Sequence, residues 1–227
     1  MKIPAIIALC LASLLVHAED KVVYPTFGNI ERLDPRLDKL IPKDAKLEKL
    51  ADGLDWSEGP LWIKDGGFLI FSDVPQNTIF KWKEGDTKVS VYMKPSGYTG
   101  DTPRSGEPGS NGITADASGR LILAEHGDRR ISRVEKDGKK TTLADKYDGK
   151  RFNSPNDVCV KSNGDFYFTD PPYGLVKNWN DPARELDVCG VYRISGKDGN
   201  DLAESVAGVL QSVGQVLWPE DSSSGGG

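Results

Sequence analysis

Cysteine and histidine are scarce in this sequence, which has three cysteines and two histidines among 227 residues. Cys10 and His17 lie in a leader-like first segment, which leaves Cys159, Cys189 and His126 for the rest of the chain. Two cysteines in a chain of this length do not make a disulfide framework, although an exported protein can form a disulfide. One histidine excludes a His-rich zinc site, and any mechanism that needs two histidines, within one chain.

Several well-known motifs and charge patterns are also missing. The sequence has no Gly-x-Ser-x-Gly, so a nucleophile-elbow serine hydrolase is unsupported. It has neither Gly-x-Gly-x-x-Gly nor a Walker loop, the two glycine patterns that cradle phosphates. The net charge of −5 argues against general binding of nucleic acid, which requires a basic face. The remaining composition, 37% hydrophobic and 28% charged, is that of an ordinary globular protein.

The first 18 residues are typical of a secretory signal peptide. Lys2 gives a positive start, residues 3–16 are mostly apolar, and Val16-His17-Ala18 places small residues at the usual cleavage positions. A membrane anchor is the alternative, but this apolar run is shorter than the roughly 20 residues that span a bilayer. We expect cleavage after Ala18 and a protein that is periplasmic or secreted, with no membrane contact once the signal is removed.

One pattern occurs three times along the chain. Each copy has a polar residue, a short apolar strand, a turn with glycine, a second apolar strand and a carboxylate. The copies run over residues 58–73, 111–125 and 156–170. Their turns, at residues 65–67, 117–119 and 162–164, place glycine where a tight hairpin needs a positive φ.

Further short strands are expected after each copy. They cover residues 78–83 and 88–93, then 130–134 and 140–143, then 190–194 and 202–206. Four short antiparallel strands in every 45 to 53 residues are typical of a β-propeller blade. The sequence therefore predicts an all-β fold with about three four-stranded blades. A β-sandwich is the alternative, but it does not require a matched polar residue at the start of each unit.

The residues that open the three copies are candidates for a functional site. They are Glu58, Asn111 and Asn156, and the first strand of a propeller blade lines the central channel. Because rotated repeats place equivalent residues around one axis, we expect the three side chains to face a common cavity. Their hard oxygen donors suit calcium better than zinc. The alternative is that they only cap turns before strands, as asparagine often does.

Five separated motifs resemble the gluconolactonase branch of the senescence marker protein/gluconolactonase/luciferin-regenerating enzyme family. They are Leu50-Ala-Asp-Gly-Leu-Asp-Trp-Ser-Glu-Gly-Pro-Leu-Trp62, Gly109-Ser-Asn-Gly112, Glu125-His-Gly-Asp-Arg-Arg130, Phe152-Asn-Ser-Pro-Asn-Asp157 and Phe168-Thr-Asp-Pro-Pro-Tyr-Gly174. The lead-in, Leu33-Asp-Pro-Arg-Leu-Asp-Lys-Leu-Ile-Pro42, is also similar. The resemblance runs from about residue 30 to residue 195.

This resemblance implies a six-bladed propeller that holds one divalent metal, usually calcium, and hydrolyses sugar lactones in carbohydrate metabolism. It implies that Glu58 is a metal ligand and that Asn156 lies beside the metal and contacts the substrate. Asn111 is then expected to line the same pocket. His126 lies in the family's Glu-His-Gly motif and is expected in the substrate pocket. The alternative is a histidine satisfied by neighbouring backbone.

The last part of the sequence departs from the family. The resemblance implies two later inner strands, with Asn-Gly and Asp-Gly, and the family's catalytic aspartate in a late blade, but neither strand follows Ile194. The catalytic residue is therefore unknown, and the chain is expected to be truncated or frameshifted. We expect little lactonase activity from it, and self-association through the exposed edges of its blades.

The expected organisation has four parts. They are a signal peptide at 1–18, a lead-in at 19–43, a partial propeller at 44–206 and a linker-like tail at 207–227. Two other functions stay open: a non-catalytic exported binding module or inert remnant, and a calcium-dependent esterase of another propeller type. Cys159 and Cys189 are expected to stay unpaired, because a strand is predicted between them and two strand spacings exceed the reach of a disulfide.

Overall fold

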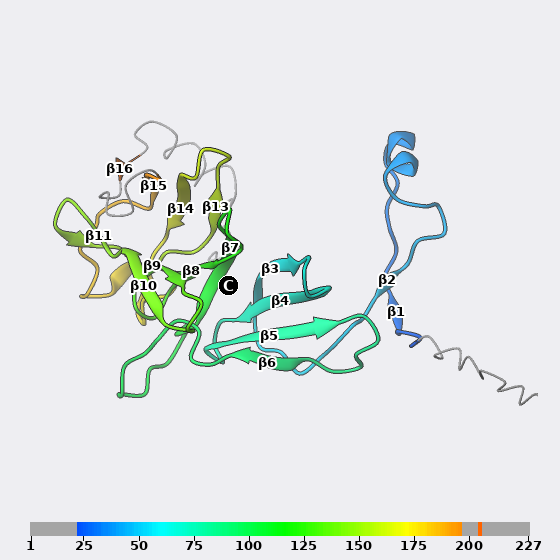
Figure 1. Ribbon diagram of the computed structural model, residues 1–227, viewed down its shortest axis with the longest axis horizontal. Coiled ribbons are helices and arrows are strands. Elements are labelled where there is room, and N and C mark those ends of the chain that lie inside the picture. Colours follow the sequence, from blue (N-terminus) through cyan, green and yellow to red (C-terminus); the bar gives the residue numbers. More distant parts are fainter. Residues whose placement is uncertain (1–21, 197–203, 206–227) are drawn as a thin grey trace, which may run out of the picture. The chain divides into compact units, whose positions relative to one another are not determined.

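The computed structural model describes residues 22–196 and 204–205 (Figure 1). The expected signal peptide and the 207–227 tail lie outside the described residues. The chain divides into two compact units, Met1–Glu48 and Lys49–Gly227. Within the described ranges, none of the helices is long and apolar enough to cross a membrane.

The first unit contains a two-stranded ribbon and one turn of helix. Strand β1 (Thr26–Phe27) pairs antiparallel with β2 (Leu47–Glu48), and the 3-10 helix η1 (Pro35–Lys39) lies between them in the chain. The side chain of Asp34 caps η1 by accepting a 2.8 Å hydrogen bond from the backbone N–H of Arg36. Proline at the start of the helix fits this cap, since its missing N–H is not needed there.

The second unit is built from three four-stranded antiparallel sheets (Figure 1). In each sheet, strands that are consecutive in the sequence are neighbours. The first sheet holds β3 (Ser57–Ile63), β4 (Phe68–Asp73), β5 (Thr78–Lys83) and β6 (Ser90–Met93). The second holds β7 (Ser110–Ala115), β8 (Leu121–Glu125), β9 (Arg130–Val134) and β10 (Lys140–Ala144). The third holds β13 (Val158–Val160), β14 (Phe166–Asp170), β15 (Gly190–Ile194) and β16 (Glu204–Ser205). The predicted all-β fold of four-stranded antiparallel sheets is confirmed.

The predicted hairpin turns are also confirmed. Gly67, Gly119 and Gly164, which connect the first two strands of the three sheets, have φ values of 60°, 77° and 92°. A side chain is strained at such angles, whereas glycine adopts them freely. The spacing of these glycines therefore fixes the register of each first hairpin.

In the second unit, a small hairpin and a 3-10 turn were not predicted from the sequence. Strands β11 (Lys146–Tyr147) and β12 (Lys150–Arg151) form a small hairpin after the second sheet. Its turn has positive φ at Asp148 and Gly149, and Asp-Gly is a strong hairpin signal in a sequence. A 3-10 turn, η2 (Asn178–Asn180), lies in the connection between β14 and β15.

The core lies on both faces of the middle sheet. Leu121 and Leu123 on β8 pack in a cluster with Ile70 and Ile79 of the first sheet. Ile122 and Ala124, on the other face of β8, pack in a second cluster with residues of the third sheet that include Phe166, Phe168, Tyr192 and Ile194. Because side chains alternate between the faces of a strand, β8 reads as one unbroken apolar run. The three sheets thus stack face to face in chain order.

The third sheet confirms the strand order on which the cysteine prediction depends. Strand β14 lies between β13, which contains Cys159, and β15, which follows Cys189. Both cysteines are free thiols in the structure.

Candidate functional site

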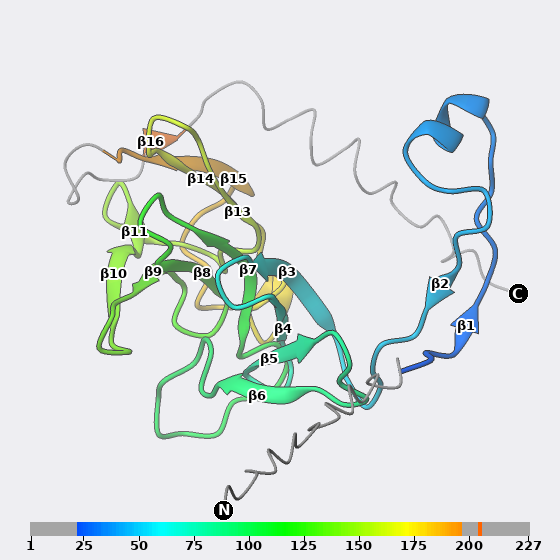
Figure 2. The ribbon, with the colours of Figure 1, turned by 45° about the vertical axis from the view of Figure 1, so that its right-hand side comes forward.

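The first strands of the three sheets lie side by side near the middle of the second unit (Figure 2). Strand β3 contacts β7, and β7 contacts β13. A Cβ on Gly59 would lie 2.2 Å from the carbonyl oxygen of Asn111, so only glycine allows β3 and β7 to approach this closely. Gly112 has the same role at the next junction, where a Cβ would lie 2.8 Å from the Cα of Asp157. Its N–H donates a 2.7 Å hydrogen bond to the carbonyl oxygen of Asn156.

These contacts place the three candidate residues at equivalent points of neighbouring segments. Glu58 directly precedes Gly59, and Asn111 directly precedes Gly112. Asn156 directly precedes Asp157, the residue against which Gly112 packs. Regular pairing is interrupted at the same point of the first two sheets, between Glu58 and Leu61 in β3 and between Ser110 and Ile113 in β7. Bulges of this kind re-aim side chains and are frequent beside functional sites.

Two aspartates hold the segments that lead into the site. Asp73, the last residue of β4, accepts hydrogen bonds from the backbone N–H groups of Asp55 and Trp56, at 2.8 and 3.4 Å. These donors lie three and two residues before Glu58 in the chain. The carboxylate that ends the first repeat in the sequence is thus a support for the segment that leads into the first strand of its own sheet.

Asp170, the last residue of β14, repeats this arrangement in the third sheet. It accepts hydrogen bonds from the N–H groups of Asn153 and Ser154, at 2.7 and 2.8 Å, three and two residues before Asn156. Burial raises the pKa of Asp170 to about 7, although these hydrogen bonds and the nearby Arg129 and Arg184 act to lower it. In the second sheet the matching carboxylate is that of Glu125, and its partners are side chains of the same sheet.

Glu125, at the end of β8, bonds within its own sheet instead. Its carboxylate lies 2.7 Å from Nε of Arg130 and 3.1 Å from Nζ of Lys140, and it accepts a hydrogen bond from the hydroxyl of Ser132. Glu125 is fully buried, and three donors on β9 and β10 satisfy its charge. This residue therefore stabilises the second sheet and is not available as a ligand.

Glu58 and Asn111 differ in exposure. Glu58 is half-buried, and the indole N–H of Trp56 donates a 3.1 Å hydrogen bond to its Oε1. Asn111 is buried on β7. Beside it, the hydroxyls of Ser110 and Ser72 share a 2.8 Å hydrogen bond that ties β7 to β4.

His126 lies against Asn156, which joins two of the predicted site residues directly. The imidazole is fully buried, and its Nε2 lies 3.3 Å from Nδ2 of Asn156. On the other side of the ring, Nδ1 lies 3.0 Å from Oε2 of Glu107. Glu107 was not identified from the sequence, because it belongs to the irregular connection between β6 and β7. The sequence links Glu107 to the site only through its position, four residues before Asn111.

Close packing fixes His126 in place. A Cβ on Gly174 would lie 2.5 Å from Cβ of His126 and 2.7 Å from Cβ of Ser154, so this position requires glycine. Arg104 donates hydrogen bonds to the carbonyl oxygens of Gly127, at 2.7 Å, and Gly174. Burial lowers the pKa of Arg104 from its ordinary value. The Pro-Pro-Tyr-Gly motif thus contributes the wall against which the histidine rests.

The donors at this place fit a hard cation. One carboxylate, Glu58, and two amide side chains, Asn111 and Asn156, begin adjacent strand segments, and oxygen ligands of this kind suit calcium. Across the described part of the chain, no three His, Cys, Asp or Glu side chains gather as a metal-binding group. The fit therefore depends on amide oxygens, and the described residues supply only part of a shell of six to eight oxygens.

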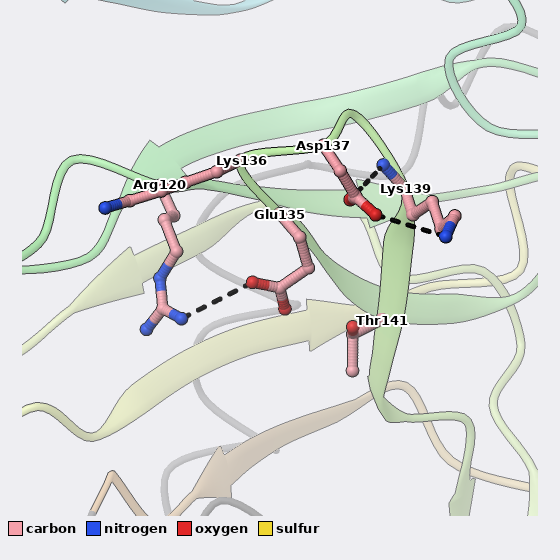
Figure 3. A pocket seen from close by; sticks show the side chains of 6 residues that line it. All are labelled: Arg120, Glu135, Lys136, Asp137, Lys139 and Thr141. Carbon is pink, nitrogen blue, oxygen red and sulfur yellow. Dashed lines mark hydrogen bonds and ion pairs between the residues drawn. The ribbon is translucent and has the colours of Figure 1, made fainter.

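A separate hollow lies over the turn between β9 and β10 (Figure 3). It is lined by Arg120, Glu135, Lys136, Asp137, Lys139 and Thr141. Two ion pairs join its lining residues, with Arg120 3.4 Å from Glu135 and Lys139 3.2 Å from Asp137. None of the candidate site residues lines this hollow, and we assign it no function.

Comparison with known proteins shows which family this chain belongs to. Residues 56–223 match the family described as SMP-30/Gluconolactonase/LRE-like region. A gluconolactonase from Zymomonas mobilis subsp. mobilis is 40% identical over 200 residues, which are 87% of this chain and 55% of that protein. The chain therefore spans about half the length of this curated relative.

Solved structures give the same relationship. A gluconolactonase from Xanthomonas campestris is 31% identical with a TM-score of 0.62, over 82% of this chain and 57% of that chain. A structural-genomics target placed with the gluconolactonases is 34% identical with a TM-score of 0.64, over 76% of this chain and 56% of that chain. With its all-β sheets and this family match, the chain belongs to the SMP-30/gluconolactonase/LRE-like family.

Proposed function

We propose that the protein hydrolyses sugar lactones at a divalent metal site, most simply a calcium site, to which this chain contributes Glu58 and Asn156. The observation that carries the proposal is the contact of β3, β7 and the segment before β13, which brings the residues opening each repeat to neighbouring positions. The similarity to proteins named gluconolactonases supports the substrate class.

Each residue has a distinct part in this proposal. A bound divalent cation supplies polarisation of the lactone carbonyl and stabilisation of developing negative charge. Glu58 gives the carboxylate charge that holds such an ion, and Asn156 gives an amide oxygen. Asn111 lies beside these ligands and would contact the sugar hydroxyl groups. His126 is fully buried, and its two ring nitrogens face Asn156 and Glu107, so it would act from behind Asn156 and not by contact with the sugar. Glu58 remains half-exposed, so a ligand from solvent can reach it.

The test is hydrolysis of glucono-δ-lactone by the protein expressed from its complete gene, with calcium and after chelation. We expect calcium-dependent turnover that Glu58→Gln reduces by at least about 100-fold, because the amide keeps the shape but removes the charge. The control is Glu84→Gln, the same change at an exposed residue after β5. A turnover rate that is unchanged by chelation or by Glu58→Gln contradicts the proposal.

The same assay separates the two other functions. A protein that binds calcium but turns over no lactone is a binding module. A protein that cleaves aryl esters faster than lactones is an esterase of another type.

We also propose that the protein is exported. The support is the charged start, apolar run and Val16-His17-Ala18 of the first segment. The mass of the protein recovered from the periplasm or medium tests this. A mature chain that begins at Glu19 is expected, and an intact first segment in the cytoplasm contradicts it.

A further inference from the structure

We propose that Glu107 and His126 are positioning residues that set the orientation of the Asn156 side-chain amide. They hold its Nδ2 against the imidazole and thereby leave Oδ1 as the atom presented to a cation. This inference rests on the proposed metal site and specifies how one of its ligands is oriented. It is carried by two contacts of one buried ring, Nδ1 to Glu107 at 3.0 Å and Nε2 to Asn156 at 3.3 Å.

The contact with Glu107 determines which ring nitrogen carries the proton. Nδ1 of His126 is buried and has no aligned hydrogen bond, and the Glu107 carboxylate is the charged group beside it. A lone pair on Nδ1 would face a negatively charged oxygen at 3.0 Å, whereas an N–H there is attracted to it. The neutral ring is therefore held as the Nδ1–H tautomer.

The tautomer in turn determines how the amide lies. With the proton on Nδ1, Nε2 is an acceptor, and it receives a hydrogen bond from Nδ2 of Asn156. The opposite amide orientation would press Oδ1, a second acceptor, against the lone pair of Nε2. Because buried acceptors that face each other are unfavourable, the amide keeps its nitrogen on the histidine. Groups behind metal ligands commonly orient them in this way.

The surroundings keep this chain of contacts rigid. The N–H of His126 donates a 3.1 Å hydrogen bond to the carbonyl oxygen of Gly109, two residues after Glu107. The N–H of Gly109 donates at 2.8 Å to the carbonyl oxygen of Val74, which anchors the same connection to the first sheet. Gly174 packs against the other side of the histidine. The ring therefore has little freedom to turn away from either neighbour.

The first test reads the tautomer directly from the ¹⁵N chemical shifts of the imidazole. His126 is the one histidine outside the expected signal peptide, so its signals need no assignment in the mature protein. We expect the Nδ1–H form in the neutral ring, and a shift toward Nε2–H in Glu107→Gln. Finding Nε2–H in the unchanged protein overturns the inference. This test needs no metal, so it stands even if the proposed metal site fails.

The second test measures calcium affinity by calorimetry in two variants of His126. In His126→Gln the side-chain oxygen can accept from Nδ2 of Asn156, whereas His126→Leu has no acceptor. We expect the affinity to fall by about 10-fold or more in the leucine variant and to be largely retained in the glutamine variant.

Thermal melts of both variants control for folding. Equal losses of calcium affinity in the two folded variants overturn the inference. Failure of calcium to bind the unchanged protein overturns the metal site instead, and the tautomer then decides this inference alone.

Discussion

The N–H of Gly112 donates a 2.7 Å hydrogen bond to the carbonyl oxygen of Asn156, and this bond joins the first strand of one sheet to the segment that begins the next. Gly59 makes the matching junction one sheet earlier, against the carbonyl oxygen of Asn111. Two glycines thus hold the three candidate residues together. The glycine that follows Glu58 and Asn111 in the motifs is explained by this packing.

Replacing Gly59 with alanine is expected to destabilise the protein strongly. A Cβ there would lie 2.2 Å from the carbonyl oxygen of Asn111, and backbone cannot move aside as a flexible side chain can. The matched control is Gly67→Ala, because Gly67 has nearly the same φ, 60° against 55°, but no atom within 4 Å of the added Cβ. Both variants carry the conformational cost of a positive φ, about 1–2 kcal/mol.

Denaturant unfolding of the two variants separates the two costs. We expect the Gly59 variant to lose about 1–3 kcal/mol more than the Gly67 variant, which is the usual range for overpacking. Equal losses would mean that β3 and β7 do not approach each other this closely.

Asp170 is expected to make stability depend on pH. Burial raises its pKa from 3.8 to about 7, so between these values the folded protein holds a proton that the unfolded chain releases. Its contribution is therefore fully present below pH 3.8 and is lost as the pH rises to about 7. The slope from this one group is at most about 1.4 kcal/mol per pH unit.

The measurement is the free energy of unfolding from pH 4 to pH 8 in the unchanged protein and in Asp170→Asn. The difference between the two should change across this window and level off above pH 7, near the pKa of the buried carboxyl. A difference that is constant with pH would show that Asp170 titrates alike in the folded and unfolded chain.

The two cysteines are expected to react as free thiols at different rates. Cys159 is exposed on β13, whereas Cys189 is half-buried and burial raises the pKa of its thiol. Because the thiolate is the reactive form, Cys189 should label more slowly in the native protein. Both should label fully after denaturation without reductant. Labelling of Cys189→Ser identifies the fast phase, and a protein without free thiols contradicts the strand order.

Much of the fold follows from local sequence patterns. Strands over residues 78–83, 130–134 and 190–194 have the predicted bounds, because alternating apolar residues and turn glycines fix both ends. The hairpin around Asp148 was missed although Asp-Gly marks it, since its strands are too short to form a pattern.

The site was predictable only where a repeat exposed it. Glu58, Asn111 and Asn156 were proposed because equivalent positions in a repeat become neighbours, and the structure brings their segments together, while their role in a site stays a prediction. Glu107 was not, because its contact with His126 joins an irregular connection to the end of β8 across 19 positions. The supporting role of Asp73 and Asp170 was also hidden, because a carboxylate at a strand end does not reveal which backbone donors it faces.

The most direct test of the account is a calcium titration by calorimetry of the unchanged protein, Glu58→Gln and Glu84→Gln. We expect one calcium site, unchanged affinity in the Glu84 variant, and affinity at least about 10-fold weaker in the Glu58 variant, because a hard cation depends on carboxylate charge. Equal calcium affinity in all three proteins would contradict the claim that the residues opening the repeats form a metal site.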